Sequence, residues 1–212
     1  SAGNSLLSRG LSTYNERNMP QLESAFEMAL FPMSMYDFII QIGFVTKAES
    51  LLTSMNIQKN KRSSARTSKD GVVQIIDHGQ YSALAGYVAS YFPWYSKGKA
   101  NAGELGKVQY SILKEADLKT SELKPVNSKL EKLGWSKKAA NDFNDDYLSP
   151  ILRGSIVLVY ADSKMNGEET LNAQKHTLYL LQGKKNSWLV DFPNGDQEPG
   201  SVQQVDQNSF SE

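Results

Sequence analysis

Three oxygen-bearing side chains, Asp142, Asn144 and Asp146, lie two residues apart, which is the spacing with which a calcium-binding loop begins. Oxygen ligands on alternate loop residues can converge on one cation. The rest of such a loop does not follow, because Tyr147 stands where the turn needs glycine and Arg153 stands where the loop needs glutamate. We therefore expect helix-capping and turn roles for these residues, and no metal site.

Gly98 and Gly103 have the separation of the two glycines in a phosphate-binding loop. The positions that should carry a lysine and a hydroxyl group hold Glu104 and Leu105 instead. This removes both the counter-charge for the phosphate and the magnesium ligand. The sequence predicts a glycine-rich loop over residues 97–106 and no nucleotide cofactor.

The side chains available for catalysis are few, since the chain has two histidines and no cysteine. Thiolate chemistry, disulfides and thiolate metal sites are thereby excluded. His78 lies in a turn-like Asp-His-Gly segment, and His176 alternates with apolar neighbours, as a half-exposed strand residue does. There is no Gly-x-Ser-x-Gly motif, and no serine can be matched to a histidine. We expect no catalytic residue and no cofactor.

Aromatic side chains gather around Pro93, where the chain carries Tyr91, Phe92, Trp94 and Tyr95. Four rings so close together cannot all enter one helix face, so some should be exposed or line a groove. Aromatic rings with polar tips are good anchors for a ligand or a partner protein. The alternative is a corner where a helix end packs over a sheet. We retain Tyr91, Trp94 and Tyr95 as binding candidates.

The first half of the chain reads as mainly helical. Apolar spacing predicts amphipathic helices over residues 6–14 and 20–30, and a largely buried third helix from Ser34 that continues or re-forms through Met55. Residues 56–70 predict a solvated basic loop, with an anion or lipid-headgroup patch as the functional alternative; its cations are Lys59, Lys61, Arg62, Arg66 and Lys69. Residues 72–76 predict a short strand, and residues 81–92 a helix ended by Pro93.

The second half switches between strand and helix patterns. A period of two predicts a strand over residues 108–113, and a helix should run from Thr120 to Leu133 and end at Gly134. A short helix should follow from Ser136 to Phe143. We find no second copy of a fixed-period pattern, so the chain is not a solenoid.

Three successive antiparallel strands are predicted from ILRGSIVLVY (151–160), KHTLYLL (175–181) and SWLVDF (187–192), with hairpin connections near residues 165–168 and 183–186. On the last strand, Trp188, Val190 and Phe192 should share one face, and Leu189 and Asp191 the other. The tail over residues 194–212 is polar and should be disordered or loosely held.

The charge balance argues against nucleic acid as a partner. The 23 basic and 23 acidic residues of this 212-residue chain cancel, so the basic surface that holds a phosphate backbone is missing. The longest apolar run, residues 35–45, is interrupted by Asp37, Gln41 and Gly43 and is too short to cross a bilayer. We expect no transmembrane segment.

A family resemblance rests on two segments, KVQYSILKEADLKTSELKPVNSKLEKLGWS (107–136) and KHTLYLLQGKKNSWLVDF (175–192). These segments resemble the C-terminal part of nuclear-transport-factor-like (cystatin-like) domains. The likeness lies in the order of elements, which is strand, helix, glycine, short lysine-rich helix, long strand, hairpin and last strand. Such domains occur in lipoproteins and envelope proteins of Gram-positive bacteria. The resemblance implies a bent sheet around a cone-shaped cavity, which members use as an active site or as a docking surface.

We accordingly expect an α+β fold in which N-terminal helices pack on a bent, cone-like C-terminal antiparallel sheet. Three parts are expected: a helical part over residues 1–70, which includes the basic loop, a cone-like part over residues 71–193 and a polar tail over residues 194–212. Alternatively, residues 5–193 form a single domain. Tyr179, Trp188 and Asp191 are the candidates for the face that meets a ligand. In an apolar cone Asp191 could act as a base, although the sequence offers no second group to pair with it.

The functional hypothesis is a non-enzymatic, exported or cell-surface module that binds a partner protein or a small apolar ligand through the open side of its sheet. The alternatives are an isomerase or dehydratase with its acid or base in the cone, and a subunit of an envelope secretion or conjugation assembly.

Export from a bacterium is expected on two grounds. The absence of cysteine suits an oxidising compartment. The opening Ser-Ala-Gly-Asn-Ser suits a tether after a signal peptide or a lipid anchor upstream of Ser1, although a truncated chain would look the same. The sequence has no Asn-x-Ser/Thr glycosylation site, which favours a bacterial cell envelope over a eukaryotic cell surface.

Overall fold

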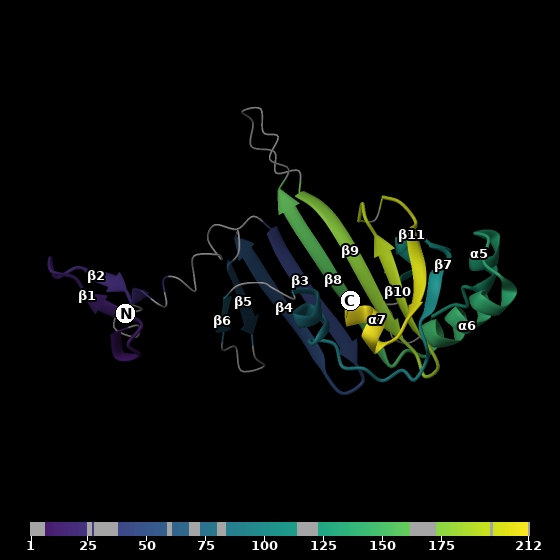
Figure 1. The fold of residues 1–212 in the computed structure, drawn as a ribbon, viewed down its shortest axis with the longest axis horizontal. Coiled ribbons are helices and arrows are strands. Elements are labelled where there is room, and N and C mark those ends of the chain that lie inside the picture. The colour runs from purple at the N-terminus through teal and green to yellow at the C-terminus, as the bar shows by residue number, and fades with distance from the viewer. Residues whose placement is uncertain are drawn as a thin grey trace, which may run out of the picture.

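The computed structural model describes residues 7–24, 27, 38–58, 61–67, 73–79, 84–113, 123–161, 173–195 and 197–211. Its main element is a sheet of nine strands in the order β6-β5-β4-β3-β8-β9-β10-β11-β7, with every neighbouring pair antiparallel (Figure 1). Two short strands, β1 (Ser12–Tyr14) and β2 (Pro20–Leu22), form a separate two-stranded sheet near the N-terminus.

Each half of the large sheet is a meander of four strands followed by a short helix. The first half consists of β3 (Phe38–Thr46), β4 (Ser50–Gln58), β5 (Lys61–Thr67), β6 (Val73–Gly79) and α3 (Leu84–Ala89). The second half consists of β8 (Leu152–Ala161), β9 (Ala173–Gln182), β10 (Ser187–Phe192), β11 (Gly200–Val205) and α7 (Gln207–Ser211). The two halves meet where β3 pairs with β8.

The segment between the two halves adds an edge strand and two helices to the second half. Strand β7 (Asn101–Val108) pairs with β11, and α5 (Asn127–Lys132) and α6 (Lys137–Leu148) follow it. Ser136 caps α6, since its hydroxyl accepts a hydrogen bond from the Ala139 amide at 3.2 Å. Figure 1 shows α5 and α6 at the β7 end of the sheet, and α3 and α7 together over its middle.

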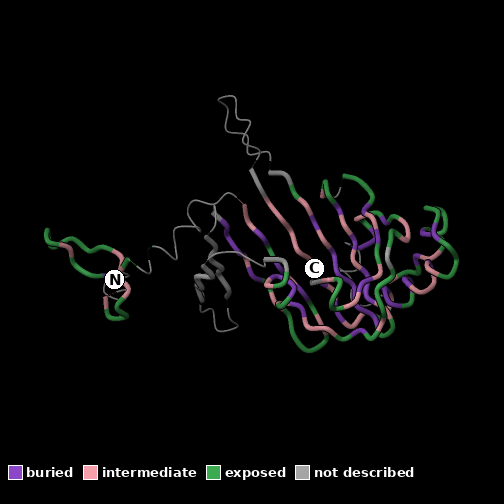
Figure 2. The backbone as a smooth tube through the Cα atoms, in the orientation of Figure 1, coloured by how far each residue is buried: buried purple, intermediate pink, exposed green. Residues whose placement is uncertain are grey.

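Two hydrophobic clusters lie on opposite faces of the sheet. Figure 2 shows that the buried residues follow the strands of the large sheet, whereas its turns are mostly exposed. One packs α3 and α7 over the central strands, and its members include Ile42, Met55, Val88, Phe92 and Leu180. Phe210 of α7 contacts Phe92 edge-on, with ring centroids 5.6 Å apart. The other cluster packs α5 and α6 over β9, β10, β11 and β7. The sheet is therefore a middle layer with helices on both faces.

The expected fold class is wrong, because the sheet dominates the molecule and takes strands from both halves of the chain. The predicted buried helix from Ser34 to Met55 is in fact β3 and β4 over its described residues. Its apolar run is rich in isoleucine and phenylalanine, and such short runs cannot be assigned to helix or strand by periodicity alone. An open sheet with helices packed on part of each face replaces the predicted cone.

Several local predictions change as well. Residues 12–14 and 20–22 are strands where helices were expected, and residues 23–37 lie mostly outside the described residues. The predicted basic loop contains β5, and the predicted glycine-rich loop contains most of β7. Residues 110–113, expected as strand, form a helical turn. The proposed boundary at residue 70 falls between the paired strands β5 and β6, and the polar tail holds β11 and α7.

The end of the second half matches the sequence more closely. The three predicted strands are present as β8, β9 and β10, joined in antiparallel register. The β9–β10 connection lies at residues 183–186 as expected, and residues 165–168 lie outside the described residues. A strand and a helix were also expected near β6 and α3, and both are present.

Two glycines allow the helical layer to approach the sheet closely. A Cβ atom on Gly106, whose φ is +153°, would lie 2.4 Å from the indole nitrogen of Trp135. That nitrogen donates a hydrogen bond to the carbonyl of Lys107 at 2.8 Å. A Cβ atom on Gly183 would overlap the carboxylate of Asp146 on α6. Only glycine fits at these two contacts without displacing a side chain that is already hydrogen-bonded.

We predict that Gly183→Ala destabilises the protein by about 1–3 kcal/mol, because the methyl group must displace the buried Asp146 carboxylate. Gly43→Ala is the matched control, since a Cβ atom there meets its nearest neighbours at 3.5 and 3.6 Å, an ordinary contact. Urea unfolding of both variants measures the difference. Equal stability of the two variants would contradict the packing of α6 against the β9–β10 turn.

A second prediction concerns α7, whose start is capped by Asp206. The pKa of Asp206 is lowered by hydrogen bonds from the backbone N–H groups of Ser209 and then Ala100, at 3.0 and 3.3 Å. A carboxylate whose pKa is lower in the folded state stabilises the fold above its unfolded pKa of about 3.9. That contribution is lost as the pH falls through the folded pKa.

The stability of the unsubstituted protein should therefore fall more steeply below about pH 4 than that of Asp206→Asn, which has no charge to lose. Urea midpoints measured between about pH 6 and pH 2 test this. Parallel pH profiles for the two proteins would show that the carboxylate does not stabilise α7.

Candidate functional site

One face of β4, β3 and β8 carries apolar side chains with no described helix over them; we call it the open face. Strand register places its residues side by side, with Gly43 between Leu52 and Ser155, and Gln41 between Ser54 and Val157. The open face consists of Ile39, Gln41, Gly43, Val45, Leu52, Ser54, Ser155, Val157 and Val159.

The open face exposes side chains that a sheet centre usually buries. Leu52 is 77% exposed and Val45 is 61% exposed, whereas Ile40, Ile42 and Phe44, which point to the other side of β3, are buried. Ile39, Val157 and Val159 are half-buried. Strands β3, β4 and β8 each pair with a strand on both sides. Val45 and Leu52 lie beside the β3–β4 turn, where Leu52 pairs with Gly43 of β3.

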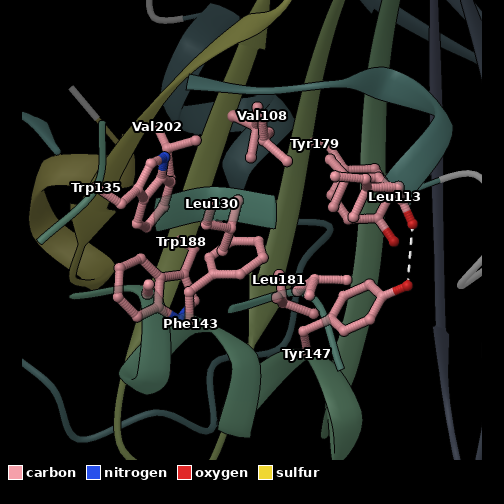
Figure 3. Close-up of a cluster of buried hydrophobic side chains, with 14 of the residues drawn as sticks. Val108, Leu113, Leu130, Trp135, Phe143, Tyr147, Tyr179, Leu181, Trp188 and Val202 are labelled. Carbon is pink, nitrogen blue, oxygen red and sulfur yellow. Dashed lines mark hydrogen bonds between the residues drawn. The ribbon is translucent and has the colours of Figure 1, made fainter. Parts of the chain in front are cut away.

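The same face is closed in the second half of the sheet. Figure 3 shows Tyr147 and Phe143 of α6 packed with Tyr179, Leu181 and Trp188 of the sheet. Tyr147 also donates a hydrogen bond to the carbonyl of Ile112 at 3.0 Å. Helices thus cover this face over β9 to β7, and the cover stops at β8 among the described residues.

Basic side chains lie at the border between the open and closed parts. Arg153, which is half-buried, lies across from Val45, and Lys175, which is exposed, lies across from Val159. Both belong to the same face as Leu52. They are the charged groups among the described side chains that β3, β4, β8 and β9 place on this face. An incoming surface that carries carboxylates would match the exposed Lys175.

The aromatic candidates around Pro93 lie on the opposite face, at the corner between α3 and the sheet. The hydroxyls of Tyr91 and Tyr87 are 2.8 Å apart, and the ring of Trp94 lies 5.7 Å from that of Phe210. The backbone N–H of Tyr95 donates to the buried Gln182 at 2.8 Å, and Gln182 donates to the Pro93 carbonyl at 3.0 Å. These contacts are those of a packed corner, from which the Tyr95 side chain is exposed.

The remaining candidates, Tyr179, Trp188 and Asp191, are not brought together. Tyr179 and Trp188 are buried beneath α5 and α6, and Trp188 donates a hydrogen bond to Asp146 at 3.0 Å. Asp191 points to the other face, opposite Leu178. The two-face division predicted for the last strand is thus the one observed, and it separates Asp191 from Tyr179.

Asp191 has a partner that the sequence did not suggest. Its Oδ1 lies 2.5 Å from Nε2 of His176, and the two side chains are 42% and 37% exposed. The residues face each other diagonally on β9 and β10. The pairing could have been found by aligning the two predicted strands about their hairpin, because this places His176 and Asp191 on one face. A histidine–carboxylate pair can transfer protons, although here it lies on a solvent-accessible strand surface.

The oxygen-bearing side chains of α6 have structural roles in the described fold. Asn144 accepts a hydrogen bond from the Val126 amide at 2.8 Å, and Asp146 accepts one from Asn186 at 3.1 Å. Among the residues the structure describes, no group of three or more histidine, cysteine or carboxylate side chains could hold a metal ion. Lys59 and Lys69 of the basic segment lie outside the described residues.

No described helix is both long enough and apolar enough to cross a membrane. No family model matches the chain, so its resemblance to nuclear-transport-factor-like domains stays a prediction. A search of curated proteins returns no match either.

A solved structure does share the fold. It is the type VII secretion system chaperone EspG5 of Mycobacterium tuberculosis, in complex with the PE25–PPE41 dimer. The similarity has a TM-score of 0.63 at 7% sequence identity and covers 98% of this chain and 80% of that chain. At this identity the similarity concerns the fold alone.

We predict that Leu52→Asp changes the free energy of unfolding by less than about 0.5 kcal/mol, because the side chain is already in water. Leu181→Ala, on the closed part of the same face, should cost about 2–5 kcal/mol because it leaves a cavity under α6. Chemical denaturation compares the two variants. A large loss of stability with Leu52→Asp would mean that the open face is covered in solution.

Proposed function

We propose that this chain is a non-enzymatic docking module that binds a partner protein through the open face. The observation that carries the proposal is the exposure of Leu52 and Val45 on two neighbouring strands of a large sheet. Soluble proteins seldom leave contiguous apolar surface uncovered unless it meets a partner. Small ligands are held mostly in concave pockets, so an uncovered sheet face favours a protein over the small apolar ligand also considered.

The partner should be sought first in a secretion or envelope assembly, which is the finer part of the proposal. Its support is the shared fold, since the similar structure is that of a secretion chaperone in complex with a protein dimer. The absence of cysteine in the sequence supports a location in the bacterial cell envelope. Fractionation of the native host with an antibody against this chain would test that location.

The His176–Asp191 pair supports a second candidate function, a small-molecule enzyme that uses this pair as its acid and base. The 2.5 Å contact and the accessibility of both side chains are the supporting observations. A docking module should tolerate His176→Ala and Asp191→Asn without loss of partner binding. Loss of a measurable turnover in both variants, with partner binding unchanged, would favour the enzyme.

The docking proposal predicts a stoichiometric complex between the purified chain and a purified protein from the native host. Leu52→Asp should weaken that complex at least tenfold, about 1.4 kcal/mol, because it places a charge in the apolar contact. Met19→Asp is the matched control, because Met19 is similarly exposed but lies between β1 and β2. Titration calorimetry with both variants gives the dissociation constants.

Equal weakening by both substitutions would place the contact elsewhere. The absence of any stoichiometric protein complex would overturn the docking function itself.

A further inference from the structure

The two halves of the large sheet have the same order of elements, four strands and a helix, and we infer that they are copies of one unit related by a two-fold rotation. A short repeat in the sequence supports this: GVVQIID at residues 71–77 and GSVQQVD at residues 200–206 share glycine, valine, glutamine and aspartate at the same four positions. The first copy contains the start of β6 and the second contains β11, which are the fourth strands of the two meanders.

Strand register extends this match to the middle of the sheet. Ile76 and Val205 are equivalent residues of the two fourth strands. From Ile76, successive cross-strand partners toward the sheet centre are Ser64, Met55 and Ile40. From Val205, they are Ser187, Gln182 and Leu152. Met55 and Gln182 are both fully buried, as equivalent positions should be. The two copies meet at the Gly43–Ser155 pair, which lies on the axis.

Leu52 is the counterpart of Tyr179 in this match, because each lies three residues before the equivalent pair Met55 and Gln182. Tyr179 is 4% exposed and Leu52 is 77% exposed. Ser54 corresponds in the same way to the buried Leu181. The two halves share a backbone framework, and they differ in what covers this face.

The cover in the second half is α5 and α6. Helix α6 leads directly into β8 and packs Ala140, Phe143 and Tyr147 toward the sheet (Figure 3). In the first half, β1 and β2 form their own small sheet, and the segment directly before β3 lies mostly outside the described residues. The open face thus corresponds to the surface of the second half on which α6 packs. We call the open face, considered as a surface on which a helix can pack, the helix seat.

We propose that the open face binds an amphipathic helix of a partner protein in the position that α6 takes in the second half. This inference rests on the docking function proposed above and specifies the partner. The partner helix should carry apolar residues three, four and seven positions apart, as α6 does. It should carry carboxylates on the side that meets the exposed Lys175.

The test uses the full chain and one fluorescent label. Because the sequence has no cysteine, Leu52→Cys provides a single site for an environment-sensitive fluorophore. The probe is a synthetic peptide of residues 136–149 (SKKAANDFNDDYLS), added up to about 1 mM, which is the effective concentration that a short linker provides. We expect a saturable blue shift of the label. The same label at Met19→Cys is the control and should not respond.

Two further peptides define the chemistry of the seat. A peptide that carries Phe143→Ala and Tyr147→Ala should not shift the emission, since it lacks the apolar stripe. A peptide that carries Asp142→Asn and Asp145→Asn should bind at least about threefold more weakly, and the difference should shrink in high salt. No shift of the Leu52→Cys label with the unsubstituted peptide would overturn the proposal.

Two other outcomes separate this inference from the docking function. If the label of the Leu52→Cys variant is already shielded in the free protein, residues of the chain itself cover the seat, and the proposal is wrong. If the native partner binds and Leu52→Asp weakens it, hydrogen exchange on the partner identifies the bound segment. A bound segment without helical protection would overturn the helix seat and leave the docking function intact.

Discussion

The pairing of β3 with β8 is the contact on which the rest of the structure depends. It runs from Phe38 opposite Tyr160 to Thr46 opposite Leu152 and is the only ladder that joins the two meanders of the described sheet. Side chains on one face of it, such as Ile42 and Leu152, are fully buried under α3 and α7. Burying each such side chain contributes about 1.5–3 kcal/mol. A break in this ladder would separate the two halves and open the cluster that both helices share.

The helical layers follow from that central ladder in unequal ways. On one face, α3 and α7 come from equivalent places in the two halves and meet through Phe92 and Phe210. On the other face, α5 and α6 come from the segment that precedes the second half, and they cover that half only. Among the residues that the structure describes, the sheet therefore carries one symmetric and one asymmetric helical layer. The apolar surface around Leu52 is a product of this asymmetry.

The sequence predicted the elements whose signals are local. Ser136 marks the start of α6 and Gly134 follows the end of α5 as expected, Gly134 having a φ of +92°, and alternating patterns identified β8 to β10. Strand β3 was misread because it is apolar on both faces over much of its length, and β4 was then read as a continuation of the same helix. The repeat escaped detection because register, and not residue identity, carries most of it. The open face depends on which helix packs over which strands, and local sequence patterns do not predict this long-range packing.

The contact between Trp135 and Gly106 has a consequence for how the sheet ends. Strand β7 is an edge of the sheet, and an edge strand offers its free N–H and C=O groups to any passing strand. The Trp135 indole takes up the carbonyl of Lys107, and the two positive-φ glycines, Gly103 and Gly106, bend the strand away from a regular ladder. A second molecule would have to displace the indole before it could extend the sheet there. The tryptophan thus occupies one of the edge carbonyls with which an added strand would have to pair.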